Sequence, residues 1–151
     1  MDSKITVRPA TMDDHALIVA NNQAMAMETE NRRLEDAIVQ AGVRNLLLDS
    51  SKGFYLVAEW EGKPVGNLMI TREWSDWRNG DMWWFQSVYL MPEGRGKGVF
   101  SAMFRTVEDM ARAEGVKELR LYVERDNHSA QKVYSKLGMK HSHYDMWEME
   151  L

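Results

Sequence analysis

The chain has 151 residues, of which 44% are hydrophobic and 28% are charged, and this make-up suits one globular domain over residues 1–151. Its net charge of −4 gives no electrostatic attraction to nucleic acid, and the absence of cysteine excludes disulfides, zinc–thiolate sites and a thiol nucleophile. No apolar run is long enough for a membrane helix or a signal peptide, so we expect a cytoplasmic protein with no membrane partner.

The first half of the chain predicts a short strand, two helices and a hairpin. A brief alternating run stops at Pro9, as is typical of an edge strand. Thr11 and Asp14 have the spacing of a capping box, and apolar residues recur after them at helical spacing. Two runs rich in β-branched and aromatic side chains flank a turn. The expected elements are a strand at 5–8, helices from the capping box to about 27 and at 31–48, and hairpin strands at 54–59 and 64–70.

The second half predicts a central strand and a helix joined by a glycine-rich segment. Residues 74–81 are polar and contain glycine, which indicates a loop, and the largely apolar run 82–91 is typical of a central strand. A helical period then continues to Gly115. The remaining expected elements are a strand at 119–123, a helix capped by Asn127 that continues through 137, and a last strand or hairpin at 141–151. Together they predict an α+β domain around a mixed sheet.

Three glycines lie between the expected central strand and the following helix, in the segment 94–98. Glycine lets a backbone approach a ligand closely, and a helix N-terminus offers unpaired N–H groups and the positive end of the helix dipole. The spacing is neither that of a Walker loop nor that of a dinucleotide-binding loop. The segment therefore indicates either a phosphate site or a tightly packed turn without a ligand.

Two segments together resemble the acetyl-CoA-binding signature of the Gcn5-related N-acetyltransferases. Leu90-x-Pro92-Glu93-x-Arg95-Gly96-x-Gly98 is similar to the family's V-x-P-E-x-R-G-x-G, with Leu in place of Val. Asn127, Ala130, Tyr134, Gly138 and Met139 match the family's N-x-x-A-x-x-x-Y-x-x-x-G-F/M. The resemblance covers about residues 5–140 and implies an α+β fold of the α/β three-layer type. In that fold a mixed, mostly antiparallel sheet of about six to seven strands, with a splayed central strand, is flanked by about four helices.

The resemblance implies transfer of an acetyl group from acetyl-CoA to a primary amine by direct attack in a ternary complex. In the family pattern, backbone groups of the central strand and Asn127 bind the pantetheine arm, and Tyr134 protonates the leaving thiolate. A phenol with an ordinary pKa of about 10 suits that step. Phe100 departs from the usual Gly or Ala. The implied cofactor-binding residues are Val88, Tyr89, Leu90, Arg95, Gly96, Lys97, Gly98, Val99, Phe100 and Asn127.

The general base and the amine site have no strong signal in the sequence. Family members often carry Glu on the central strand, but 82–90 contains no carboxylate, so we expect a water ordered by Gln86, which has the strand parity of Val88 and Leu90. Acidic and aromatic side chains near the expected acceptor side would suit a cationic amine, or are ordinary surface and packing groups. These candidates are Glu28, Glu73, Trp74, Asp76 and Trp77.

Other interpretations remain compatible with the sequence. The missing strand carboxylate and Phe100 also fit a non-catalytic module that binds or senses acyl-CoA, and a domain without any cofactor is a further alternative. No metal is expected, because His141 and His143 lack an evident third ligand. The short segment after Met139 and its alternating pattern suggest a homodimer.

Overall fold

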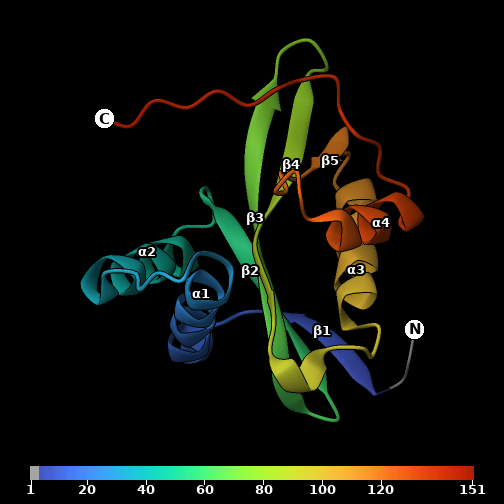
Figure 1. Cartoon of the computed structure of the whole chain (residues 1–151). Coiled ribbons are helices and arrows are strands. Elements are labelled where there is room, and N and C mark those ends of the chain that lie inside the picture. Colours follow the sequence, from blue (N-terminus) through green and yellow to red (C-terminus); the bar gives the residue numbers. More distant parts are fainter. Residues whose placement is uncertain (1–3) are drawn as a thin grey trace. The chain divides into compact units, whose positions relative to one another are not determined.

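A computed structural model describes residues 4–151 (Figure 1). Contacts divide the chain into two compact units, which meet in the sequence between Leu121 and Tyr122; the expectation of one domain stays a prediction. The elements of the first unit are β1 (Ile5–Pro9), the short 3₁₀ helix η1 (Met12–Asp14), α1 (His15–Glu30), α2 (Asp36–Leu48), β2 (Gly53–Trp60), β3 (Lys63–Ser75), β4 (Gly80–Leu90), the 3₁₀ helix η2 (Pro92–Gly94), α3 (Val99–Ala113) and β5 (Glu118–Arg120). The second unit contains α4 (His128–Lys136).

Within the described residues the sheet has five strands, in the order β1-β2-β3-β4-β5. All neighbours are antiparallel except β4 and β5, which are parallel. This confirms the mixed, mostly antiparallel sheet and the four helices, but the strand count is below the six to seven expected. The β4–β5 ladder pairs Met82–Trp84 with Glu118–Arg120, the whole of β5, so β4 continues to Leu90 beyond the end of its parallel partner. The splay expected of the central strand stays a prediction.

Several expected element bounds are wrong. The strand expected at 141–151 has no regular structure, and Trp147 and Met149 there are largely exposed. A segment with alternating side chains forms a strand only where its backbone N–H and C=O groups pair with those of a neighbouring strand, and within residues 4–151 no strand pairs with this segment. The strand expected at 119–123 is shortened to β5. The second helix begins at Asp36 instead of residue 31, because Asn31 adopts a left-handed φ of 48° and ends α1.

The hairpin between β3 and β4 is longer than the sequence predicts. Cross-strand pairing continues to Ser75 opposite Gly80, so half of the loop expected at 74–81 is strand and the turn is confined to 76–79. The remaining turn contains Asn79, a residue type that tolerates its left-handed φ of 50°.

Helices cover both faces of the sheet in the first unit: α1 and α2 lie on one face and α3 lies on the other (Figure 1). The α1–α2 side is packed around Ile18, Val43 and Tyr55. On the α3 side, Phe104 stacks on Phe85 of β4, with ring centroids 5.2 Å apart and an interplanar angle of 4°. The apolar face of α3 thereby fixes the helix against β4, directly beyond the glycine-rich segment. None of the helices in residues 4–151 is long and apolar enough to span a membrane.

A β-bulge interrupts β4 at Ser87. Asn67 of β3 pairs with Tyr89, whereas Met69 pairs with Gln86, so two residues of β4 lie opposite one residue of β3. Ser87 has a left-handed φ of 48°. The bulge reverses the alternation of side chains, since Phe85 contacts α3 whereas Tyr89 contacts Glu28 of α1.

The expected common parity of Gln86 with Val88 and Leu90 is therefore wrong. Gln86 is adjacent to Phe85 and lies on the opposite face, the one to which Tyr89 points after the bulge. The sequence pattern alone could not show this reversal, because a bulge adds one residue to a strand without changing its composition.

Candidate active site

The glycine-rich segment joins η2 to α3 and contains two different kinds of glycine. A Cβ at Gly94 would lie 2.8 Å from both the Cβ and the carbonyl oxygen of Val65, so this residue is required for close packing on β3. Gly96 and Gly98 have φ angles of 73° and 78°, yet a Cβ at either would meet no atom within 4 Å. The packed-turn interpretation thus applies to Gly94, whereas Gly96 and Gly98 border open space.

The N-terminus of α3 faces that open space without a side-chain cap. Gly98 is its N-cap, and the hydrogen bond from Ala102 N–H to the Gly98 carbonyl, at 3.1 Å, begins the helical pattern. The N–H groups of a first helical turn have no acceptor within the helix, and the helix dipole adds partial positive charge there. With the neighbouring glycines this forms a backbone cradle, Gly96 to the start of α3, which suits a phosphate group.

Both cations of the segment turn back onto the protein. The Arg95 guanidinium lies 2.8 Å from a Glu28 carboxylate oxygen, and its Nε donates to the Leu90 carbonyl at 3.0 Å. Lys97 donates to the Glu93 carbonyl, and its ammonium lies 5.2 Å from the centroid of the Trp60 ring. The cradle therefore presents backbone groups, whereas the Arg95 and Lys97 side chains stabilise the segment.

Glu28, Tyr89 and Arg95 form a cluster that joins α1, β4 and the cradle. The Tyr89 hydroxyl donates to Glu28, and Arg95 binds the other carboxylate oxygen. These hydrogen bonds from Tyr89 and Arg95 lower the pKa of Glu28, whereas burial and the Glu28 carboxylate raise the pKa of Tyr89. Glu28 is thus held as a paired carboxylate, which is a weak general base.

Gln86, the residue expected to order a catalytic water, and the remaining candidates for amine binding lie along the β3–β4 hairpin. Gln86 donates to the Thr71 hydroxyl at 2.7 Å. Glu73 accepts a hydrogen bond from the Trp84 indole at 2.8 Å and forms an ion pair with Arg120 at 3.5 Å. The structure therefore places Gln86 and Glu73 on neighbouring strands, each with a side-chain partner.

Trp74, Asp76 and Trp77 lie at the far end of that hairpin. Trp74 pairs with Asp81, five positions before Gln86 along β4, which corresponds to about 17 Å of strand. Trp77 is 92% exposed. The structure does not bring these three residues together with Glu28 or with the cradle.

A buried asparagine pair beneath the bulge was missed by the sequence analysis. Asn67 is fully buried, accepts a hydrogen bond from Asn21 of α1 at 2.7 Å, and donates to the Ser87 carbonyl at 3.4 Å. The sequence signal that could have revealed this pair is the amide side chain of Asn67 inside the apolar run of β3. Such groups are rarely buried without a specific hydrogen-bond partner.

In the second unit, Asn127 lies directly before α4 and Tyr134 lies within it. Asn127 is confirmed as the N-cap, and its side-chain oxygen accepts from Ala130 N–H at 3.2 Å. Tyr134 follows seven residues later, about two helical turns along α4. Burial raises the pKa of the Tyr134 phenol, so this group is a neutral proton donor at physiological pH.

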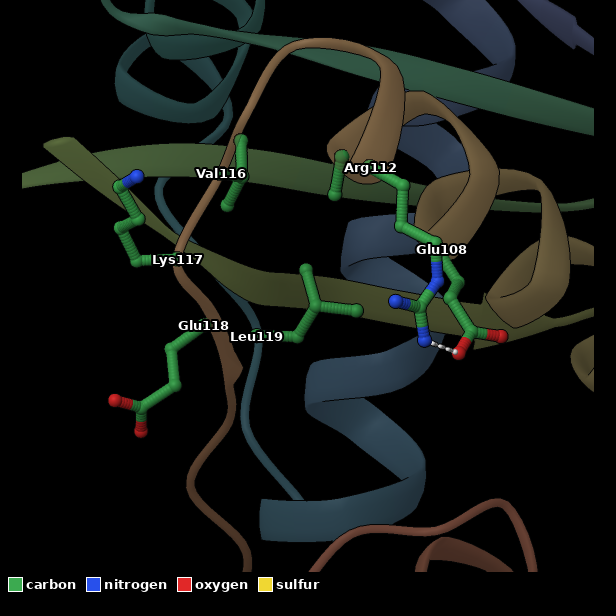
Figure 2. Close-up of a pocket in the computed structure, with 7 residues that line it drawn as sticks. Glu108, Arg112, Val116, Lys117, Glu118 and Leu119 are labelled. Atoms are coloured by element: carbon green, nitrogen blue, oxygen red, sulfur yellow. Dashed lines mark hydrogen bonds and ion pairs between the residues drawn. The ribbon is translucent and has the colours of Figure 1, made fainter.

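A shallow pocket of about 170 Å³ lies at the opposite end of α3 (Figure 2). Glu108, Arg112 and Leu119 are among its lining residues, and Glu108 pairs with Arg112 at 3.0 Å. Ten residues of helix separate Glu108 from Gly98, or about 15 Å, so this pocket is separate from the cradle. Within residues 4–151 no group of three His, Cys, Asp or Glu side chains could hold a metal ion.

A central strand β4 that continues beyond its parallel partner β5, followed by a glycine-rich cradle and by a helix packed on the sheet, is the arrangement of an acyltransferase type of fold. The chain belongs to the acetyltransferase (GNAT) family, whose family model matches residues 19–139. The resemblance seen in the sequence is thereby confirmed.

Individual relatives agree with this assignment. A possible acetyltransferase from Clostridium difficile 630 superposes with a TM-score of 0.91 and 41% identity over 99% of each chain. A predicted acetyltransferase from Clostridium acetobutylicum, solved with acetyl-CoA, superposes with a TM-score of 0.77 over 97% of this chain and 96% of that chain. The two sequences are 18% identical, so this likeness shows a shared fold only. A candidate ribosomal protein bS18-alanine N-acetyltransferase from Bacillus subtilis (strain 168) is 30% identical over 94 residues. That alignment covers 62% of this chain and 58% of the relative.

Proposed function

We propose that this protein transfers an acetyl group from acetyl-CoA to a primary amine by direct attack in a ternary complex. The observation that carries the proposal is the open backbone cradle at Gly96 and Gly98, which follows a strand that continues beyond the end of β5. The pyrophosphate of CoA is an anion of the kind that a helix N-terminus binds. The backbone from Val88 to Leu90 would bind the pantetheine arm as a sheet edge binds an extended peptide.

In this proposal the residues from Arg95 to Phe100 bind pyrophosphate through their backbone, and Asn127 binds the pantetheine arm through its side-chain amide. The Val88 N–H polarises the thioester carbonyl while the amine nitrogen attacks its carbon. The carbon–sulfur bond breaks, and Tyr134 gives its proton to the departing thiolate. The raised pKa of Tyr134 supports this role, because the phenol still carries its proton at neutral pH. The proton lost by the amine passes to a water ordered by Gln86.

The pairing of acidic residues favours an acceptor of low positive charge. Glu28 and Glu73, two of the carboxylates expected to attract a cationic amine, each form an ion pair with an arginine. Their charge is therefore largely neutralised, which favours a single amine, such as a peptide N-terminus, over a polycation. The name of the Bacillus subtilis relative, which specifies an alanine of a ribosomal protein, makes a peptide with N-terminal alanine the first acceptor to assay.

Isothermal titration with acetyl-CoA and an assay for released CoA test the proposal together. We expect binding with Kd below about 1 mM, the upper end of typical substrate constants, and CoA release with at least one amine of a panel. The panel includes the N-terminal alanine peptide, free amino acids, a polyamine and an aminoglycoside. No binding at that concentration would contradict the proposal.

A non-catalytic acyl-CoA-binding module is the second candidate. It is favoured by the pairing of Glu28 and by the absence of any carboxylate from 82–90. Binding of acetyl-CoA without CoA release from any amine, in wild type as in Tyr134→Phe, would support this module and contradict transfer.

A further inference from the structure

Asn67 connects three elements beneath the bulge of β4. Its side-chain oxygen accepts from Asn21 Nδ2 at 2.7 Å, and its own Nδ2 donates to the Ser87 carbonyl at 3.4 Å. Asn67 is fully buried and Asn21 is 4% exposed. Because the Asn21 bond occupies the oxygen of Asn67, it fixes the amide orientation in which Nδ2 faces Ser87.

The Ser87 carbonyl belongs to the irregular part of the strand. Ser87 has a φ of 48°, an uncommon conformation for a residue other than glycine, and the β3–β4 register shifts beside it. A bulge disrupts the local ladder, so its polar backbone groups need other partners. Burying an amide side chain is unfavourable unless its hydrogen bonds are made. The Asn21–Asn67 pair therefore has a specific role at this peptide, because an apolar side chain would fill the same space more favourably.

The direction of this hydrogen bond also sets the direction of the next N–H group. In a trans peptide unit the C=O of one residue and the N–H of the following residue point in opposite directions, and none of the described peptide bonds is cis. Since the Ser87 carbonyl points toward Asn67, the Val88 N–H points away from it. Asn67 thus determines which way the Val88 N–H faces.

We propose that Asn67, held by Asn21, is a positioning residue that orients the Ser87–Val88 peptide so that the Val88 N–H polarises the thioester carbonyl. The inference rests on the proposed acetyl transfer. According to this inference, the buried amides of Asn21 on α1 and Asn67 on β3 increase the rate of transfer without contacting either substrate.

Asn67→Asp is the most direct variant, because the carboxylate has nearly the same shape but cannot donate to the Ser87 carbonyl. Asn21→Ser removes the bond that fixes the Asn67 amide and keeps the test open if the buried carboxylate prevents folding. Asn22→Ser is the matched control, since Asn22 is buried on the same helix but lies outside this network. Near-UV circular dichroism checks the fold of each variant.

The readout is the infrared carbonyl band of acetyl-CoA labelled with ¹³C at the thioester carbonyl and bound without an amine. Polarisation weakens the C=O bond, so the bound band of wild type lies below that of free acetyl-CoA. We expect this shift to shrink in Asn67→Asp and Asn21→Ser and to persist in Asn22→Ser. Turnover should fall about 10- to 100-fold, because loss of a whole oriented donor lowers kcat by about 10²- to 10³-fold and these variants only misdirect the donor. The KM for acetyl-CoA should change less than about threefold, since the effect is on the transition state.

The outcomes separate the two proposals. If folded Asn67→Asp and Asn21→Ser keep both the band and the turnover of wild type, the positioning role is wrong and acetyl transfer stands. A bound band that is unshifted in wild type also overturns the positioning role. If wild type does not bind acetyl-CoA, acetyl transfer fails and the positioning role fails with it.

Discussion

Tyr89 of β4 donates its phenolic hydrogen to the carboxylate of Glu28, at the last turn of α1. The same carboxylate binds Arg95 at 2.8 Å, so one acidic side chain connects a helix, the central strand and the cradle. Sixty-seven residues separate Glu28 from Arg95 in the sequence. The contact therefore restrains the segment that precedes α3 relative to the sheet.

Glu28→Gln should alter the acid limb of the stability curve. The hydrogen bonds from Tyr89 and Arg95 lower the pKa of Glu28 in the folded state. The contribution of the Glu28 carboxylate to the stability of the fold is therefore fully present above the pKa of Glu in the unfolded chain, about 4.3. This contribution is lost as the pH falls through the lower pKa that Glu28 has in the folded state. We expect Glu28→Gln to melt below wild type at pH 6 and to lose this difference toward pH 3. Thermal melts across this range test it, and Glu30→Gln on the same helix should follow wild type throughout. An equal difference in melting temperature between wild type and Glu28→Gln at pH 6 and at pH 3 would contradict the role of Glu28 ionisation.

Gly96→Ala should weaken acetyl-CoA binding more than its stability effect explains. Its left-handed φ makes alanine unfavourable by about 1–2 kcal/mol, and the new methyl group enters the cradle. Gly115→Ala is the matched control, because Gly115 also has a φ of 73° with no atom within 4 Å but follows the C-terminus of α3. We expect a similar loss of stability in both variants and an affinity loss of about tenfold, or 1.4 kcal/mol, in Gly96→Ala alone. Urea unfolding and calorimetry measure the two effects, and equal affinities in the two variants would exclude the cradle as the pyrophosphate site.

Tyr134→Phe should separate binding from turnover. Removing a general acid lowers the rate by about 10²- to 10⁴-fold, whereas the affinity for CoA should change little. The raised pKa of Tyr134 also predicts that wild-type turnover does not fall through deprotonation of this phenol until the pH exceeds the usual tyrosine value of about 10. Tyr144→Phe, at an exposed position in the same unit, is the control. Full turnover in Tyr134→Phe would show that another group protonates the thiolate.

The parts of this fold that the sequence predicts are those with local signals. Helical spacing located α3, and the turn at 60–63 located the β2–β3 hairpin, because a few neighbouring residues decide both. The glycine-rich segment was found for the same reason, and the structure then separated Gly94, which packs on Val65, from the open Gly96 and Gly98.

Features that depend on distant partners were not predictable in this way. The bulge at Ser87 is supported by Asn67 and Asn21, which lie 20 or more residues earlier in the chain. The alternation in 141–151 satisfied the sequence criterion for a strand, but a strand also needs a partner backbone, which side-chain spacing does not reveal. The ion pairs of Glu28 and Glu73 were likewise not predictable, because their partners Arg95 and Arg120 are distant in the sequence.

Incubation of the protein with acetyl-CoA and a peptide that begins with alanine, followed by mass spectrometry of the peptide, tests acetyl transfer most directly. Acetyl transfer predicts a product heavier by one acetyl group, released CoA in equal amount, and loss of both in Tyr134→Phe. If the peptide and every other amine of the panel stay unmodified although acetyl-CoA binds, the protein is not an N-acetyltransferase for these amine classes, and the binding-module interpretation replaces transfer.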